Sequence, residues 1–262
     1  MSEHSTDPTP PEAHPSRPLV WDLPTRLFHW TFAGLFAAAF LVALLSSEHS
    51  RIFLLHMLAG LVMAFAVLLR IGWGLVGSRP SRFSAFLYRP MDLARYLRAA
   101  FEGRDQPTPG HNPAASYAVY AMLLLPLCLV ATGLLKTSGQ DWAEELHGAL
   151  AYGLLAVVVL HLAGLAWHSR RHRDRIALAM VDGRRSVAGF AGLPSHRIWA
   201  GALFLVLMGG WGFSLARGFD PVARQVALPF LGVTLPLDDG GDSKEKGGHR
   251  GEPREHGHHD DD

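Results

Sequence analysis

Residues 146–167 read LHGALAYGLLAVVVLHLAGLAW, an apolar run that carries a histidine near each end. A helix needs about 20 residues to cross the ~30 Å hydrocarbon core of a bilayer, so this run is long enough to span a membrane. His147 and His161 are fourteen residues apart. At ~1.5 Å and about 100° per residue, they lie about 21 Å apart along the helix axis and within about 40° of each other around it. The run therefore predicts a transmembrane helix that presents two imidazoles on one face, near opposite membrane surfaces.

Four other apolar runs approach the same length. The chain has 262 residues, of which 49% are hydrophobic, and its mean hydropathy of +0.14 is only mildly apolar because polar tails dilute these runs. The five runs are residues 27–45, 53–69, 114–135, 146–167 and 198–216. We therefore predict an all-α membrane protein, with a four-helix transmembrane bundle and a fifth, C-terminal transmembrane helix.

The composition divides the chain into four parts. Residues 1–19 are rich in Pro, Ser and Glu and lack an apolar core, so they are predicted to be a disordered tail and not a signal peptide. Residues 20–185 form the predicted bundle domain, and residues 186–218 form a linker and the fifth helix. Residues 219–262 are predicted to be an external polar tail rich in histidine, which either binds a metal ion or serves as a solubilising segment.

The distribution of basic residues predicts the orientation in the membrane. Residues 70–104 and 170–197 each carry seven arginines, whereas the two opposite connections hold one basic residue each, Arg51 and Lys136. Because arginine-rich connections stay in the cytoplasm, we place the N-terminus in the cytoplasm and the C-terminus in the periplasm, across a bacterial inner (cytoplasmic) membrane. Residues 90–101 are predicted to form an amphipathic helix on the membrane surface. We interpret the arginines as topology determinants and lipid contacts, and not as a nucleic-acid surface.

Four histidines in the apolar runs point to buried cofactors, because an imidazole facing hydrocarbon is costly unless it has a partner. His29 lies near the cytoplasmic start of the first run, and His56 lies just inside the external start of the second. By depth, His29 matches His161, and His56 matches His147. Each pair can clamp one haem iron between two axial imidazoles, which leaves no open position for oxygen and suits electron transfer. We therefore predict two haem b groups with these four histidines as ligands of the iron.

Other residues narrow how such haems are held. The chain has a single cysteine, Cys128, so covalent C-x-x-C-H attachment is excluded and the haems must be bound non-covalently. Haem propionates need positive partners, and Arg70 and Arg26 are the candidates at the cytoplasmic haem. His168 is a rival to His161 as ligand, because it lies seven residues further on and within about 20° of the same helix face.

Three histidines outside these runs receive no role. His111, His172 and His196 fall in the predicted cytoplasmic interfacial segments, where we expect solvated or headgroup-facing side chains.

Several motifs together resemble a known family. The motifs are W-D-x-P-x-R-x-F-H-W at 21–30, L-H-M-L-A-G at 55–60, L-L-R-I-G-W-G at 68–74, H-N-P at 111–113, L-H-x-x-L-A at 146–151 and L-H-L-A-G at 160–164. The chain between Val20 and Arg185 resembles a bacterial cytochrome b561, in the superfamily shared with the b-type cytochrome subunits of nickel-iron hydrogenases. The resemblance implies a four-helix di-haem bundle and transmembrane electron transfer, with His29, His56, His147 and His161 at the family's ligand positions.

The sequence leaves the redox partner open. Electrons could be exchanged with the quinone pool, a periplasmic cytochrome c or another redox subunit, and a homodimer is also left open. A quinol-oxidising enzyme or a hydrogenase-associated subunit is the close alternative, with external Asp141, Glu144 or Glu145 as proton acceptor beside His147. A histidine-using metal or proton transporter is a more distant alternative, but it would need paired carboxylates inside the apolar runs, which contain none.

Overall fold

Five long helices dominate the structure, a computed structural model that describes residues 17–48, 50–108, 110–186, 190–228, 230 and 232–237. In that part of the chain, five helices are long and apolar enough to cross a membrane, and they coincide with the five predicted runs. They are α1 (Leu23–Leu45), α2 (Phe53–Val76), α4 (Pro113–Thr137), α5 (Trp142–His172) and α7 (Ile198–Gly218). The predicted helical membrane bundle with a fifth C-terminal helix is therefore confirmed.

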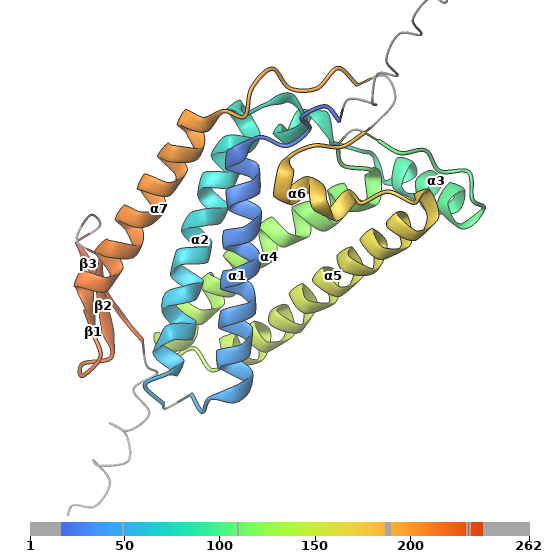
Figure 1. Ribbon diagram of the computed structural model, residues 1–262. Coiled ribbons are helices and arrows are strands. Elements are labelled where there is room, and N and C mark those ends of the chain that lie inside the picture. Colours follow the sequence, from blue (N-terminus) through green and yellow to red (C-terminus); the bar gives the residue numbers. More distant parts are fainter. Residues whose placement is uncertain are drawn as a thin grey trace, which may run out of the picture.

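The long helices pack mainly as two pairs. α1 runs along α2, α4 runs along α5, and α2 joins the two pairs by packing on α4 (Figure 1). α7 lies against α1 and α2, on the side away from α5. Within the described residues, α5 makes its close backbone contacts chiefly with α4 and few with α1 or α2. The two helices on which the sequence places His29 and His161 are therefore not packed tightly against each other.

One end of the bundle collects the short helices and most of the arginines, and we call it the arginine-rich end. α1 and α4 begin there, and α2 and α5 end there (Figure 1). The short helices are η1 (Arg79–Ser81), η2 (Phe83–Ala85), α3 (Pro90–Phe101), η3 (Ile176–Leu178) and α6 (Ala179–Asp182). α3 confirms the helix predicted at residues 90–101.

Side-chain caps fix where α1 and α4 begin. The Asp22 carboxylate accepts a hydrogen bond from the Thr25 backbone nitrogen at 3.1 Å and another from Trp73 Nε1 at 3.0 Å, so it also ties α1 to α2. Asn112 caps α4 in the same way, accepting from the Ala115 backbone nitrogen at 2.8 Å. Both are polar residues that satisfy the otherwise unpaired N–H groups of a first helical turn. Asp22 thus fixes the depth of His29, two turns further along α1.

A small antiparallel sheet lies at the opposite end, which we call the sheet end. It has the order β1 (Phe219–Asp220), β2 (Gln225–Leu228) and β3 (Val233–Pro236), with Val226 opposite Leu235. Here the structure differs from the polar tail predicted from residue 219, because Val226 and Leu228 are buried against Leu54 of α2 and Leu215 of α7. Strands this short carry little periodic signal. The histidines of the tail beyond residue 237 lie outside the described residues.

Candidate functional site

His56 of α2 and His147 of α5 face each other near the sheet end. Their ring centroids are 6.1 Å apart, with 68° between the ring planes. A metal held between two imidazole nitrogens at about 2 Å each separates those nitrogens by about 4 Å, and the ring centroids lie roughly 2 Å further apart than that. The observed separation therefore fits one metal ion ligated by both rings.

Hydrogen bonds fix which nitrogen of each ring is free. His56 Nδ1 lies 2.9 Å from the backbone oxygen of Ala39, which can only accept, so Nδ1 carries the proton. His147 Nδ1 lies 3.1 Å from Thr132 Oγ1. That hydroxyl is within 2.9 Å of the Cys128 carbonyl, to which it donates, so its lone pair accepts from His147. In both rings Nε2 is left unprotonated, as metal-ligating histidines with an oriented second nitrogen require.

The second predicted pair, His29 of α1 and His161 of α5, lies toward the arginine-rich end. The two side chains are near enough for a charge on His161 to act on His29. His29 Nδ1 is buried and has no hydrogen-bond partner among the described residues. His29 therefore lacks, within the described residues, the Nδ1 hydrogen bond that orients His56 and His147.

Unpaired nitrogen atoms of the two predicted propionate partners lie at the same end. The Arg70 side chain is buried in α2, where Nη2 donates to the Ser81 carbonyl at 3.0 Å, but Nη1 is buried with no partner in the described part of the chain. Arg26 donates from Nη2 to the Val181 carbonyl and also has a buried Nε without a partner. Buried guanidinium groups are normally paired with carboxylates. The residues therefore fit a haem, whose propionates would supply those carboxylates.

His168, the rival ligand, belongs to a different network. It is buried at the end of α5, where its Nε2 lies 2.9 Å from Arg185 Nη2 and 3.2 Å from Asp174 Oδ2. The same Arg185 nitrogen is 2.9 Å from Asp174 Oδ2. No such partners engage His161 among the described residues. This difference favours His161 as the ligand.

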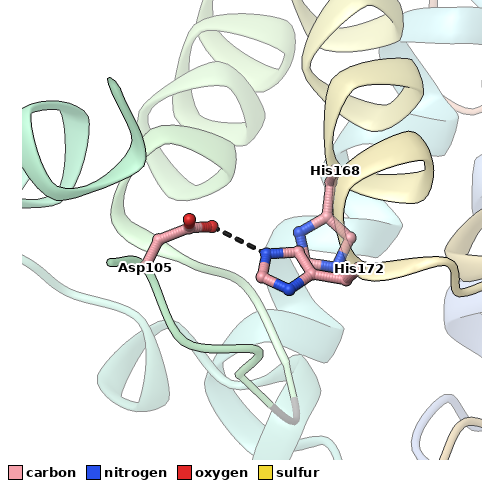
Figure 2. A group of neighbouring side chains, drawn as sticks. All are labelled: Asp105, His168 and His172. Carbon is pink, nitrogen blue, oxygen red and sulfur yellow. Dashed lines mark hydrogen bonds and ion pairs between the residues drawn. The ribbon is translucent and has the colours of Figure 1, made fainter. Parts of the chain in front are cut away.

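Figure 2 shows Asp105, His168 and His172 gathered at the end of α5, with potential ligand atoms within 4.8 Å of one another. A cation site is disfavoured, because Arg171 Nε is 3.0 Å from Asp105 Oδ1 and His172 Nε2 is 2.9 Å from Asp105 Oδ2. Burial raises the pKa of Asp105, but the hydrogen bonds and charge of His172 and Arg171 outweigh it, so this pKa lies below its ordinary value. The cluster is an ion-pair network that attaches the loop after α3 to α5.

Two histidines differ from the expected solvated side chains. His172 is bonded to Asp105 Oδ2 at 2.9 Å in the ion-pair network, and His111 lies among aromatic rings. The His111 ring packs against Phe86 and Trp21, with centroids 4.4 and 4.8 Å away. Its Nδ1 is buried without a partner among the described residues. Burial, followed by the charges of Arg70 and His161, lowers the pKa of His111 to about 3, so the ring is neutral at physiological pH. The H-N-P motif could have drawn attention to it, but sequence does not show the aromatic cover from two distant segments.

Taken together, the apolar five-helix bundle and its paired, oriented imidazoles define a membrane protein of the b-type cytochrome class. Comparison with known proteins gives the family: residues 20–183 match the model of prokaryotic cytochrome b561, and the chain belongs to that family. It is therefore a multi-pass membrane protein of the b-type cytochrome class.

Two named relatives are similar to this chain at low sequence identity. The chain is 28% identical over 137 residues to the probable Ni/Fe-hydrogenase 1 B-type cytochrome subunit of Escherichia coli K12, a match that covers 44% of this chain and 57% of that protein. It is 25% identical over 213 residues to the probable Ni/Fe-hydrogenase B-type cytochrome subunit of Rhodobacter capsulatus, covering 64% and 80% of the two chains. The chain thus spans little more than half of the Escherichia coli relative. No solved structure matches.

Proposed function

We propose that this protein carries electrons across the bacterial inner membrane through two bis-histidine haems b in a respiratory-type chain. His56 and His147 would ligate the haem at the sheet end, and His29 and His161 the haem at the arginine-rich end. The observation that carries the proposal is the 6.1 Å separation of the His56 and His147 rings, with both Nδ1 atoms hydrogen-bonded and neither Nε2 atom bonded within the described part of the chain.

The haem iron supplies the reversible one-electron chemistry, and the protein supplies ligands, orientation and a dry environment. Ala39 and Thr132 hold the ligand rings of the sheet-end site in one tautomer. Arg70 and Arg26 would hold the propionates at the arginine-rich end through their buried nitrogen atoms, which have no partner among the described residues. Two histidines ligating each iron would leave no position for an exogenous ligand, so the proposed function is electron transfer and not oxygen chemistry.

The orientation is part of the proposal. The arginine-rich end holds both connections rich in arginine, and the opposite ends of the helices are joined by connections that are not. Positive residues favour the cytoplasmic side. The N-terminus would then be cytoplasmic and the C-terminus periplasmic, with the His56–His147 site near the periplasm.

The experiment is a reduced-minus-oxidised visible spectrum of the detergent-purified protein, with the haem-to-protein ratio measured by pyridine haemochrome. We expect two low-spin b haems in the wild type and one in each of His56→Ala, His147→Ala, His29→Ala and His161→Ala. His196→Ala is the matched control, because His196 lies outside both sites. Folded protein that contains no haem, although the cells were grown with sufficient haem, would refute the proposal. The proposal would also be refuted if His196→Ala lost both haems while the four ligand variants kept theirs.

The partner is proposed from the relatives. Both named relatives are cytochrome subunits of Ni/Fe-hydrogenases, which supports a redox protein as one partner and leaves the quinone pool or a cytochrome c as the other. Co-purification from the native membrane, followed by mass spectrometry, identifies a stable partner.

A quinol oxidoreductase is the second candidate, and one observation favours it. Lys136 lies 2.7 Å from Glu48 and 3.5 Å from Glu144, and the Lys136–Glu48 pair is near enough to act on His147. Ionisable groups beside this site could take up a proton from a quinol. If Glu144→Gln and Glu145→Gln leave quinol-driven haem reduction unchanged, these carboxylates are not the acceptor.

A further inference from the structure

His111 has the features of a hydrogen-bond donor built for a ligand. Phe86 and Trp21 cover its ring from two different segments, with centroid separations of 4.4 and 4.8 Å. The Tyr88 hydroxyl donates to the His111 backbone oxygen at 3.2 Å. The ring is therefore held in place by packing, while its Nδ1 remains buried and unpaired in the described part of the chain.

Arg70 supplies a second unpaired donor in the same neighbourhood. The Phe83 and Phe86 rings link it to His111, because their centroids are 5.8 Å apart and that of Phe86 is 4.4 Å from the His111 ring. The charges of Arg70 and His161 both act on the His111 ring. Arg70 is held by the Ser81 carbonyl through Nη2, and its guanidinium lies 5.4 Å from the centre of the Phe83 ring. Its remaining buried donor, Nη1, has no partner among the described residues. His111 Nδ1 and Arg70 Nη1 are thus two buried donors near the predicted ligand His161, and a single acceptor could satisfy both.

The surroundings of His111 are immobilised by the ion-pair network of Figure 2. Asp105 ties the loop between α3 and α4 to Arg171 and His172 at the end of α5. Arg185 Nη1 donates to the Thr108 backbone oxygen at 2.8 Å, three residues before His111. A loop fixed at both points keeps the His111 donor in one position, as a preorganised binding site requires.

We propose that His111 Nδ1 and Arg70 Nη1 together bind one carboxylate, a propionate of the haem ligated by His29 and His161. This inference rests on the proposed function. A neutral imidazole N–H and a guanidinium N–H both donate to a carboxylate, and such charge-assisted hydrogen bonds are short and strong. His111 is then a haem-binding residue, and Asp105 and Arg185 are positioning residues that act through it.

The test is the rate of haem loss to excess apomyoglobin from the full-length protein in detergent. His111→Asn retains an amide donor near the position of Nδ1, whereas His111→Leu removes the donor and keeps an apolar side chain. We expect two kinetic phases in the wild type, and the phase missing from His161→Ala identifies the haem at the arginine-rich end. Loss of one hydrogen bond to a charged group should speed that phase about tenfold in His111→Leu, but by less than about threefold in His111→Asn.

Coupling to Arg70 tests whether the two donors share one carboxylate. If they do, Arg70→Gln and the double variant with His111→Leu will show a non-additive effect on the same phase. Size-exclusion profiles and the unaffected second haem report that each variant is folded. His196→Leu is the matched histidine control and should leave both phases unchanged.

Each outcome decides the inference. Fast loss in His111→Leu with near-normal loss in His111→Asn supports it. Equal acceleration in both variants means that the ring acts by packing, and no acceleration in either means that the donor is not used; both results overturn it. A wild type that holds no haem sensitive to His161→Ala overturns the proposed function itself, and this result is distinct from the other two.

Discussion

Replacing Thr132 by valine tests how the protein prepares its sheet-end site. Thr132 is buried in α4 and accepts a hydrogen bond from His147 Nδ1 at 3.1 Å. Valine has nearly the same shape, so the helix keeps its packing, but the His147 N–H loses its acceptor. A buried donor left unpaired costs about 1–3 kcal/mol. Because this hydrogen bond orients the His147 ring, its loss should weaken the affinity for the haem at this site about tenfold to hundredfold.

The variant should also change the reduction potential. An imidazole whose second nitrogen donates to an acceptor is a more basic ligand and stabilises ferric iron. Removing the acceptor should therefore raise the midpoint potential of the haem at His147. We would measure both haems by potentiometric titration and by haem transfer to apomyoglobin. The matched control on α4 is Thr137→Val, because the Thr137 hydroxyl donates to the Leu134 carbonyl at 3.0 Å. Unchanged potentials and unchanged haem loss in Thr132→Val would refute the assigned tautomer.

Three further predictions concern the arginine-rich end. Asp22→Ala removes the cap of α1 and leaves Trp73 Nε1 without its acceptor, so the free energy of unfolding in detergent should fall by about 2–4 kcal/mol. The folded pKa of Asp105 is lowered, so its stabilising bond to His172 should be present above about pH 4 and lost as the pH falls through the folded pKa. The protease resistance of residues 102–108 should therefore fall in acid. Asp105→Asn should remove this pH dependence. Burial lowers the folded pKa of His111 to about 3, whereas the ordinary pKa of a histidine is about 6.5. The unfolded state therefore binds more protons between these values, so the free energy of unfolding should rise with pH there, and His111→Asn should flatten this slope.

Sequence periodicity predicts most of the fold because membrane-spanning helices carry a strong signal. The five apolar runs and the helix at 90–101 all appear in the structure. The sheet of residues 219–236 was not predicted, because it depends on apolar contacts with Leu54 and Leu215, which lie in two separate helices. Short strands that are ordered by tertiary contacts leave little trace in a local pattern.

In the candidate site too, the features set by local spacing could be predicted from the sequence, and those set by tertiary contacts could not. Spacing and depth alone pair His56 with His147, and the structure brings the centroids of these rings within 6.1 Å, in an edge-on arrangement. The second pair, His29 with His161, stays a prediction supported by proximity and unpaired polar atoms. The burial of His111 could not be predicted, since Trp21 and Phe86 reach it from segments 90 and 25 residues earlier in the chain.

The placement of α5 explains why one helix matters to both sites. It carries His147 and His161, yet within the described residues it packs chiefly on α4 and touches α1 and α2 little. Each proposed haem would be ligated by α5 on one side and by α1 or α2 on the other. The haems would thus attach α5 to these helices, which it hardly touches directly. Anything that binds only the folded arrangement stabilises that arrangement. The proposed haems would therefore hold α5 to the rest of the bundle, and the ion-pair network of Asp105 and His172 would secure the end of α5 that lies beyond His161.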